Sequence, residues 1–159
     1  MSSLYWKMRA RLGYWLARYL LKWTWCVRQP SVWRWMEGQF SRLSAMGDKD
    51  AQSFYGHILL FRGQGFAARE EGLRLLRLAA AQGDGKAAFQ LGIQALKGGV
   101  QQAPDALAAS HYWQQAVAAG HPLAVLKLAD LLQTGGPGLP ADTQRAAELA
   151  AQFKVPSRA

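Results

Sequence analysis

Few side chains in this sequence have the type and spacing that catalysis or metal binding requires. The histidines are His57, His111 and His121, and the last two are ten residues apart across an expected helix end. No carboxylate cluster accompanies them, so this spacing does not favour a metal site. The single cysteine, Cys26, excludes an intrachain disulfide, and no base is paired with it to activate the thiol. We therefore expect no enzyme activity, no metal and no cofactor.

Two glycine-rich segments have the composition, but not the pattern, of a phosphate-binding loop. Gly63-Gln-Gly65 and Gly135-Gly-Pro-Gly138 lack the following Lys-Ser/Thr pair, and both fall between two expected helices. Asp48, Asp50 and the pair Glu70-Glu71 lie at expected helix starts, where a carboxylate interacts favourably with the helix dipole. These residues are therefore interpreted as turns and helix starts.

The elements that hold these residues follow an internal repeat. Ala51, Ala87 and Ala124 are spaced 36 and 37 residues apart. The same steps separate corresponding small residues further along each unit, at Gly56, Gly92 and Ala129, and again at Gly47, Gly83 and Gly120. Apolar residues at helical spacing predict two helices in each unit. The predicted helices cover 49–61, 68–82, 86–97, 104–119, 122–133 and 141–152.

A glycine in the middle of a helix needs a compensating reason. Gly56 and Gly92 both fall inside predicted helices, where glycine costs about 1 kcal/mol relative to alanine. We expect a partner helix to approach closely at these two positions.

The pattern of each unit is an Ala-x-x-x-Leu/Tyr-Gly start, a glycine-rich loop and an Ala…Gly end. It resembles the Sel1-like repeat, a relative of the tetratricopeptide repeat, over units 47–83, 84–120 and 121–153. The third unit departs from it with Ala129 and an enlarged loop, as is typical of a terminal capping unit. The resemblance implies an all-α fold, a short right-handed α-solenoid of antiparallel helix pairs, and an adaptor function in which the repeats bind one or more proteins.

Alignment with the tetratricopeptide groove gives candidate partner-binding positions. Phe89 and Leu126 have a second interpretation, as core residues between adjacent units, and both interpretations stay open. The groove candidates are Ser53, His57, Phe61, Phe89, Ile93, Lys97, Leu126 and Asp130.

The segment before the repeats has a different composition. Residues 1–46 carry eight basic side chains against Glu37 alone, and they hold six of the seven tryptophans. We divide this segment into an arm, 1–30, and a capping half-repeat helix, 31–46; residues 154–159 form a tail. On a helical wheel the arm has a basic stripe, with leucine and aromatic side chains opposite. The candidate attachment residues are Trp6, Lys7, Arg11, Trp15, Arg18, Lys22, Trp23 and Trp25.

Several functions fit such an arm. A basic helix with an aromatic face is typical of attachment to an anionic membrane surface, and we favour this or docking on a membrane protein complex. A transmembrane span is disfavoured because Arg18 and Lys22 interrupt an apolar stretch of only 16 residues. Packing of the arm in the interface of a larger complex, as an accessory subunit, is the main alternative, and nucleic-acid binding is a further one. No cleavable signal is expected, and the single cysteine favours the cytoplasm, with the arm peripheral on the inner face of a membrane.

Overall fold

The computed structural model describes residues 2–23, 28–99 and 102–153 of the chain; the sequence-based inferences about Trp25 and Cys26 lie outside these residues. The described part is all-helical, apart from two isolated bridges between Gly99 and Gln102 and between Gly136 and Leu139. The all-α prediction is therefore confirmed. The chain divides into two compact units, Met1–Leu78 and Ala79–Ala159.

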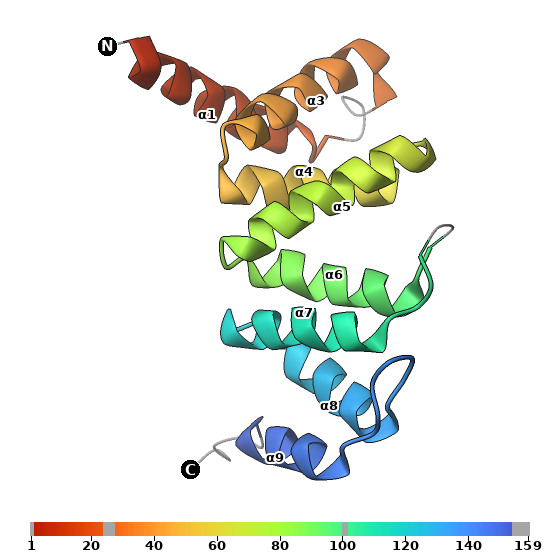
Figure 1. Ribbon diagram of the computed structural model, residues 1–159. Coiled ribbons are helices and arrows are strands. Elements are labelled where there is room, and N and C mark those ends of the chain that lie inside the picture. The colour runs from red at the N-terminus through yellow and green to blue at the C-terminus, as the bar shows by residue number, and fades with distance from the viewer. Residues whose placement is uncertain (1, 24–27, 100–101, 154–159) are drawn as a thin grey trace. The chain divides into compact units, whose positions relative to one another are not determined.

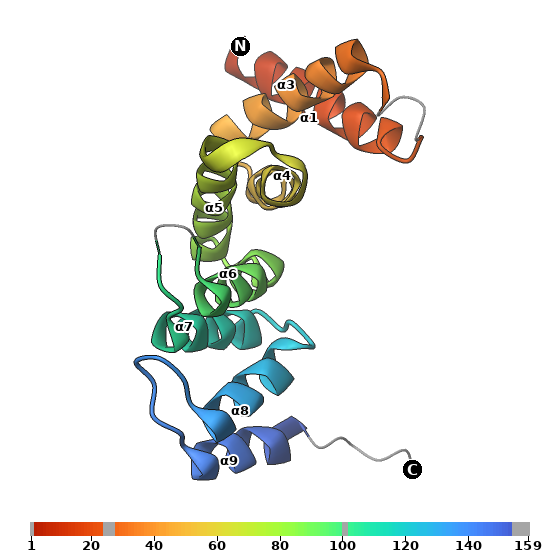
Figure 2. The ribbon, with the colours of Figure 1, turned by 90° about the vertical axis from the view of Figure 1, so that its right-hand side faces the viewer.

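Unit 1 contains α1 (Ser2–Leu20), α3 (Pro30–Ala45), α4 (Lys49–Arg62) and most of α5 (Gly65–Ala81). Figures 1 and 2 show α1 side by side with α3. The core of this unit is aromatic: Phe40 of α3 is fully buried and makes edge-to-face contacts with Tyr14 of α1 and Phe54 of α4. The arm helix therefore contributes to the core of the first unit.

Unit 2 contains α6 (Gly85–Lys97), α7 (Ala106–Ala118), α8 (Ala124–Thr134) and α9 (Thr143–Phe153), each packed against the next. Aspartates cap the starts of α6 and α7, since the Asp84 and Asp105 carboxylates accept backbone hydrogen bonds from Ala87 and Ala108 at 2.7 and 2.8 Å. A side-chain acceptor at this position satisfies an amide that the helix leaves free. Asp84 and Asp105 thus help to fix where α6 and α7 begin.

The mid-helix glycines lie where two helices approach closely, as the sequence predicts. A Cβ at Gly56 would lie 2.9 Å from Leu76 Cγ and 3.0 Å from the Gly72 carbonyl oxygen of α5. In unit 2, a Cβ at Gly92 would overlap the indole ring of Trp113 on α7. Glycine at these positions allows each helix pair to close.

The glycines that end the repeats have a different role. Gly47, Gly83 and Gly120 have φ angles of 83°, 83° and 77°, in the left-handed region that favours glycine. Each lies just after the last helix of one repeat, in the turn that leads to the next repeat. The period of 36 and 37 residues therefore marks a recurring turn in which a glycine adopts the left-handed conformation.

Candidate interaction surfaces

The packed face of α1 consists mainly of small residues. Ala10 and Ala17 are buried, and a Cβ at Gly13 would overlap the Gln39 side chain of α3. Tyr14 is a large side chain on this face, and it is also buried; Leu20 is partly buried against the same core. The small residues let α1 approach α3 closely.

Tyr14 joins α1 to α4 as well as to α3. Its ring makes an edge-to-face contact with Phe54 at a centroid distance of 6.0 Å, and its hydroxyl donates to the Asp50 carbonyl oxygen at 3.5 Å. Burial raises the pKa of the Tyr14 hydroxyl, although the nearby Arg18 guanidinium opposes this shift. Tyr14 therefore stays a neutral hydrogen-bond donor within the core.

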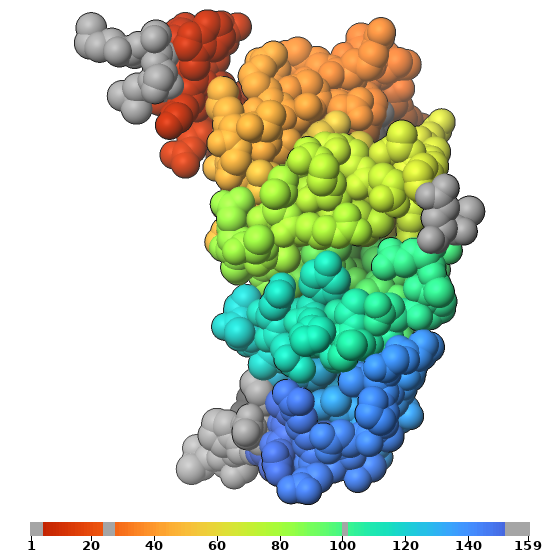
Figure 3. Space-filling model, viewed as in Figure 1, coloured from red at the N-terminus to blue at the C-terminus, as the bar shows by residue number. Residues whose placement is uncertain are grey.

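The opposite face of α1 carries large apolar side chains that are exposed. Leu12 is 72% exposed and Trp15 is 69% exposed, and Trp15 stacks on Tyr19 along the helix. In the space-filling view, the red residues of α1 lie at the margin of unit 1 (Figure 3). We call this face the α1 apolar stripe; its members on the helix are Tyr5, Met8, Leu12, Trp15, Leu16 and Tyr19, and we add Trp23, which is exposed just after the helix.

The predicted basic stripe forms one flank of α1, between the packed face and the apolar stripe. Arg11 pairs with Asp48 at 3.8 Å, and the Arg18 guanidinium lies 5.0 Å from the centre of the Phe54 ring. Lys7 and Lys22 are exposed. Two of the four basic side chains therefore touch α4 or the turn before it, so the stripe also helps to position α1.

The candidate attachment tryptophans are distributed over two faces. Trp15 and Trp23 belong to the apolar stripe, whereas Trp6 is half-exposed beside Arg9, whose guanidinium lies 5.4 Å from the Trp6 ring centre. Trp6 therefore lies beside Arg9, outside both the basic stripe and the apolar stripe.

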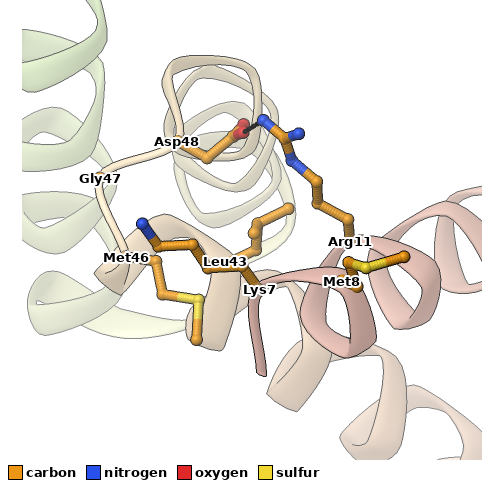
Figure 4. Close-up of a pocket in the computed structure, with 7 residues that line it drawn as sticks. All are labelled: Lys7, Met8, Arg11, Leu43, Met46, Gly47 and Asp48. Atoms are coloured by element: carbon orange, nitrogen blue, oxygen red, sulfur yellow. Dashed lines mark ion pairs between the residues drawn. The ribbon is translucent and has the colours of Figure 1, made fainter. Parts of the chain in front are cut away.

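A pocket of about 290 Å³ lies where α1 meets the turn from α3 to α4. Figure 4 shows the Arg11 guanidinium directed at Asp48 across one side of it. Sequence reasoning missed this pocket, because its two sides are more than thirty residues apart in the chain. We call it the α1–α3 pocket; it is lined by Lys7, Met8, Arg11, Leu43, Met46, Gly47 and Asp48.

The groove candidates in unit 1 differ in accessibility. Ser53 is buried, and its carbonyl oxygen accepts a hydrogen bond from His57 Nδ1 at 2.7 Å. His57 is half-buried and stacks on Phe61, which is 65% exposed. His57 and Phe61 can therefore reach a partner, whereas Ser53 has little surface to offer.

The groove candidates in unit 2 also separate into two groups. Phe89 and Ile93 are half-buried and pack against the core of this unit. Lys97, Leu126 and Asp130 are exposed. The exposed members are the ones available to a partner in this structure.

His121 is a contact residue of unit 2 that sequence reasoning did not use. Its ring stacks on Phe89 at a centroid distance of 4.3 Å, and its buried Nδ1 has no hydrogen-bond partner among the described residues. Burial lowers the pKa of His121, and the positive charge of Lys86 lowers it further, whereas Asp84 opposes the shift. The neutral imidazole is thus the form that this stack favours.

Two kinds of site are absent from the described residues. These residues contain no group of three or more His, Cys, Asp or Glu side chains placed to hold a metal ion. Among the helices described, none is both long enough and apolar enough to cross a bilayer.

Comparison with solved structures confirms the Sel1-like repeat fold. A Sel1 repeat protein from Oxalobacter formigenes superposes with a TM-score of 0.57 and 28% identity, over 72% of this chain and 88% of that one. A protective antigen of uropathogenic Escherichia coli strains, displaying an SLR fold, gives a TM-score of 0.62 at 21% identity over 75% of this chain. This chain spans 26% of that antigen's length. No protein-family model matches the sequence, and neither does any curated protein.

Proposed function

We propose that this chain is a non-enzymatic adaptor that binds a partner protein through its repeats and attaches to an anionic membrane surface through α1. The repeat part of the proposal is supported by the fold, since Sel1-like repeat proteins typically mediate protein–protein interaction. The attachment part is supported by one observation: α1 packs with its small face and leaves its apolar stripe exposed. The cytoplasmic face of a membrane is the proposed location.

The exposed stripe has the properties that interfacial binding requires. Transfer of its leucine, tryptophan and tyrosine side chains from water to the acyl boundary would stabilise the bound state by on the order of 1 kcal/mol for each half-exposed residue. Residues 2–23 carry five basic side chains and no acidic one. Each Lys or Arg near an anionic surface adds about 1 kcal/mol. Apolar burial and charge therefore favour the same orientation of α1.

Vesicle flotation of the full chain tests the attachment. Deleting the arm would be a poor test, because Tyr14 completes the core around Phe40 and Phe54. We would compare Leu12→Glu, on the apolar stripe, with Leu126→Glu, on α8 in the other unit. Both leucines are highly exposed, at 72% and 65%, so the substitutions are matched in chemistry and in expected effect on folding.

The wild-type chain and Leu126→Glu should float with vesicles containing phosphatidylglycerol, less so at high salt, and Leu12→Glu should not. If Leu12→Glu floats as well as the wild-type chain, the stripe is not the lipid contact. If the wild-type chain does not float with any of the vesicles, membrane-surface attachment is wrong. The stripe would then be a docking face for a protein, as in the accessory-subunit alternative.

The repeat surface can be tested with the same pair of variants. Proximity labelling in a membrane-free extract should mark the same proteins with the wild-type chain and with Leu12→Glu, but should not mark them with Leu126→Glu. Identical labelling by all three chains would remove Leu126 from the partner site.

A further inference from the structure

The α1–α3 pocket combines an apolar wall with a basic rim. Met8, Leu43 and Met46 supply the wall, and Lys7 and Arg11 supply the cations. The Arg11–Asp48 pair is long, at 3.8 Å, and the Arg11 side chain is 75% exposed, so much of the guanidinium can still donate to a ligand. Lys7 forms no ion pair with any residue that the structure describes.

The one carboxylate in the pocket already has another function. Asp48 caps α4, since its Oδ1 accepts a hydrogen bond from the Ala51 amide at 2.9 Å, while Oδ2 faces Arg11. Asp48 therefore offsets one of the two cations and leaves the rim with net positive charge. An anionic group on the ligand fits this balance.

The position of the pocket on α1 connects it to the apolar stripe. Met8 belongs both to the pocket wall and to the stripe. At about 100° per residue, Lys7 and Arg11 lie about 40° apart on the flank next to Met8. When the stripe lies on a bilayer, this flank faces the headgroup layer. The pocket, which shares Lys7, Met8 and Arg11 with this flank, would then lie beside the headgroups.

We infer that the α1–α3 pocket binds the headgroup region of one anionic phospholipid. The phosphate oxygens accept hydrogen bonds from Lys7 and Arg11, and the glycerol and first acyl methylenes contact Met8 and Met46. A pocket of about 290 Å³ holds only this part of a lipid, and the acyl chains continue along the apolar stripe into the bilayer. The inference rests on the proposed membrane attachment and adds a specific lipid site to it.

Methionine methyl NMR on the full chain gives a direct test. Met8 and Met46 line the pocket, whereas Met36 is fully buried in the core and serves as an internal control. The probe is short-chain phosphatidylglycerol below its micelle concentration, beside short-chain phosphatidylcholine and inorganic phosphate. The Met8 and Met46 signals should shift saturably with phosphatidylglycerol, while the Met36 signal stays in place.

Two matched variants locate the anion contact. Lys7→Gln removes a cation that lines the pocket, and Lys22→Gln removes an exposed cation of the same stripe that does not. Loss of one charge-assisted hydrogen bond should weaken phosphatidylglycerol binding by about tenfold in Lys7→Gln. Lys22→Gln should change it by less than about twofold, because an exposed charge outside the site is screened by solvent and salt.

The outcomes separate this inference from the proposed function. If phosphatidylglycerol moves neither methyl group while the wild-type chain still floats, the lipid site is wrong and surface attachment stands. If inorganic phosphate binds as tightly as the lipid, the pocket is a simple anion site, and the lipid assignment is overturned. Saturable lipid shifts in a chain that does not float would support the pocket and refute attachment through the stripe. Equal weakening by both variants would place the phosphate outside the pocket.

Discussion

Replacing Gly92 by alanine tests whether glycine in the repeat is required for helix packing. The new Cβ would overlap the indole of Trp113, which is buried and donates from Nε1 to the Phe89 carbonyl oxygen at 3.1 Å. Overpacking costs about 2 kcal/mol, and the weakened hydrogen bond about 1 kcal/mol. The better helix propensity of alanine offsets about 1 kcal/mol. The free energy of unfolding should therefore fall by about 2 kcal/mol.

Urea unfolding followed by circular dichroism measures this change. With a denaturant slope of about 2 kcal/mol per molar, the midpoint should fall by about 1 M. Gly38→Ala is the matched control, because Gly38 lies inside α3 and an added Cβ would meet nothing within 4 Å; it should stabilise the protein by about 0.5–1 kcal/mol. In a Trp113→Phe background the cost of Gly92→Ala should shrink. An unchanged cost there would refute the role of the indole contact.

Two further predictions concern the arm and the histidine stack. Tyr14→Ala should lower the free energy of unfolding by about 3 kcal/mol, because it removes a buried ring between Phe40 and Phe54. Tyr14→Phe should cost less than about 1 kcal/mol in the same urea titration, since the lost hydrogen bond is long at 3.5 Å. Because the pKa of His121 is lowered, the folded state binds fewer protons than the unfolded state near this pKa. The free energy of unfolding should therefore fall as the pH drops through 6.5, the ordinary pKa of a histidine. His121→Gln should flatten this part of the pH profile, and a profile unchanged by the substitution would contradict the assignment.

The sequence predicted the helices because their signals repeat. Three units with the same spacing of small residues, alanine and glycine, indicate helix starts, loops and ends together, and the helices lie within a few residues of the predicted ranges. The close approach at Gly56 and Gly92 was also predictable, since a costly residue repeated inside a helix implies a compensating contact. The partner residues Leu76 and Trp113 were not, because the glycine itself does not specify what lies opposite.

The candidate interfaces were predicted less completely. The wheel of the arm separates basic and aromatic faces, but it does not show which face packs, because Ala10, Gly13 and Ala17 give a weak hydrophobic signal. Their importance comes from the close distance to α3, which depends on tertiary structure. The α1–α3 pocket and the Phe89–His121 stack likewise join residues from separate helices or turns.

The orientation of α1 is itself an argument for an external ligand. Burial of a face with Leu12, Trp15 and Tyr19 would remove more apolar area from water than burial of the small face does. The structure nevertheless leaves that face exposed, and contiguous apolar patches of this kind on protein surfaces mark interaction sites. Tyr14 and Arg18 hold α1 against α4, the helix that presents Phe61. Attachment through the stripe would therefore set the direction in which the first repeat presents its candidate partner-binding residues.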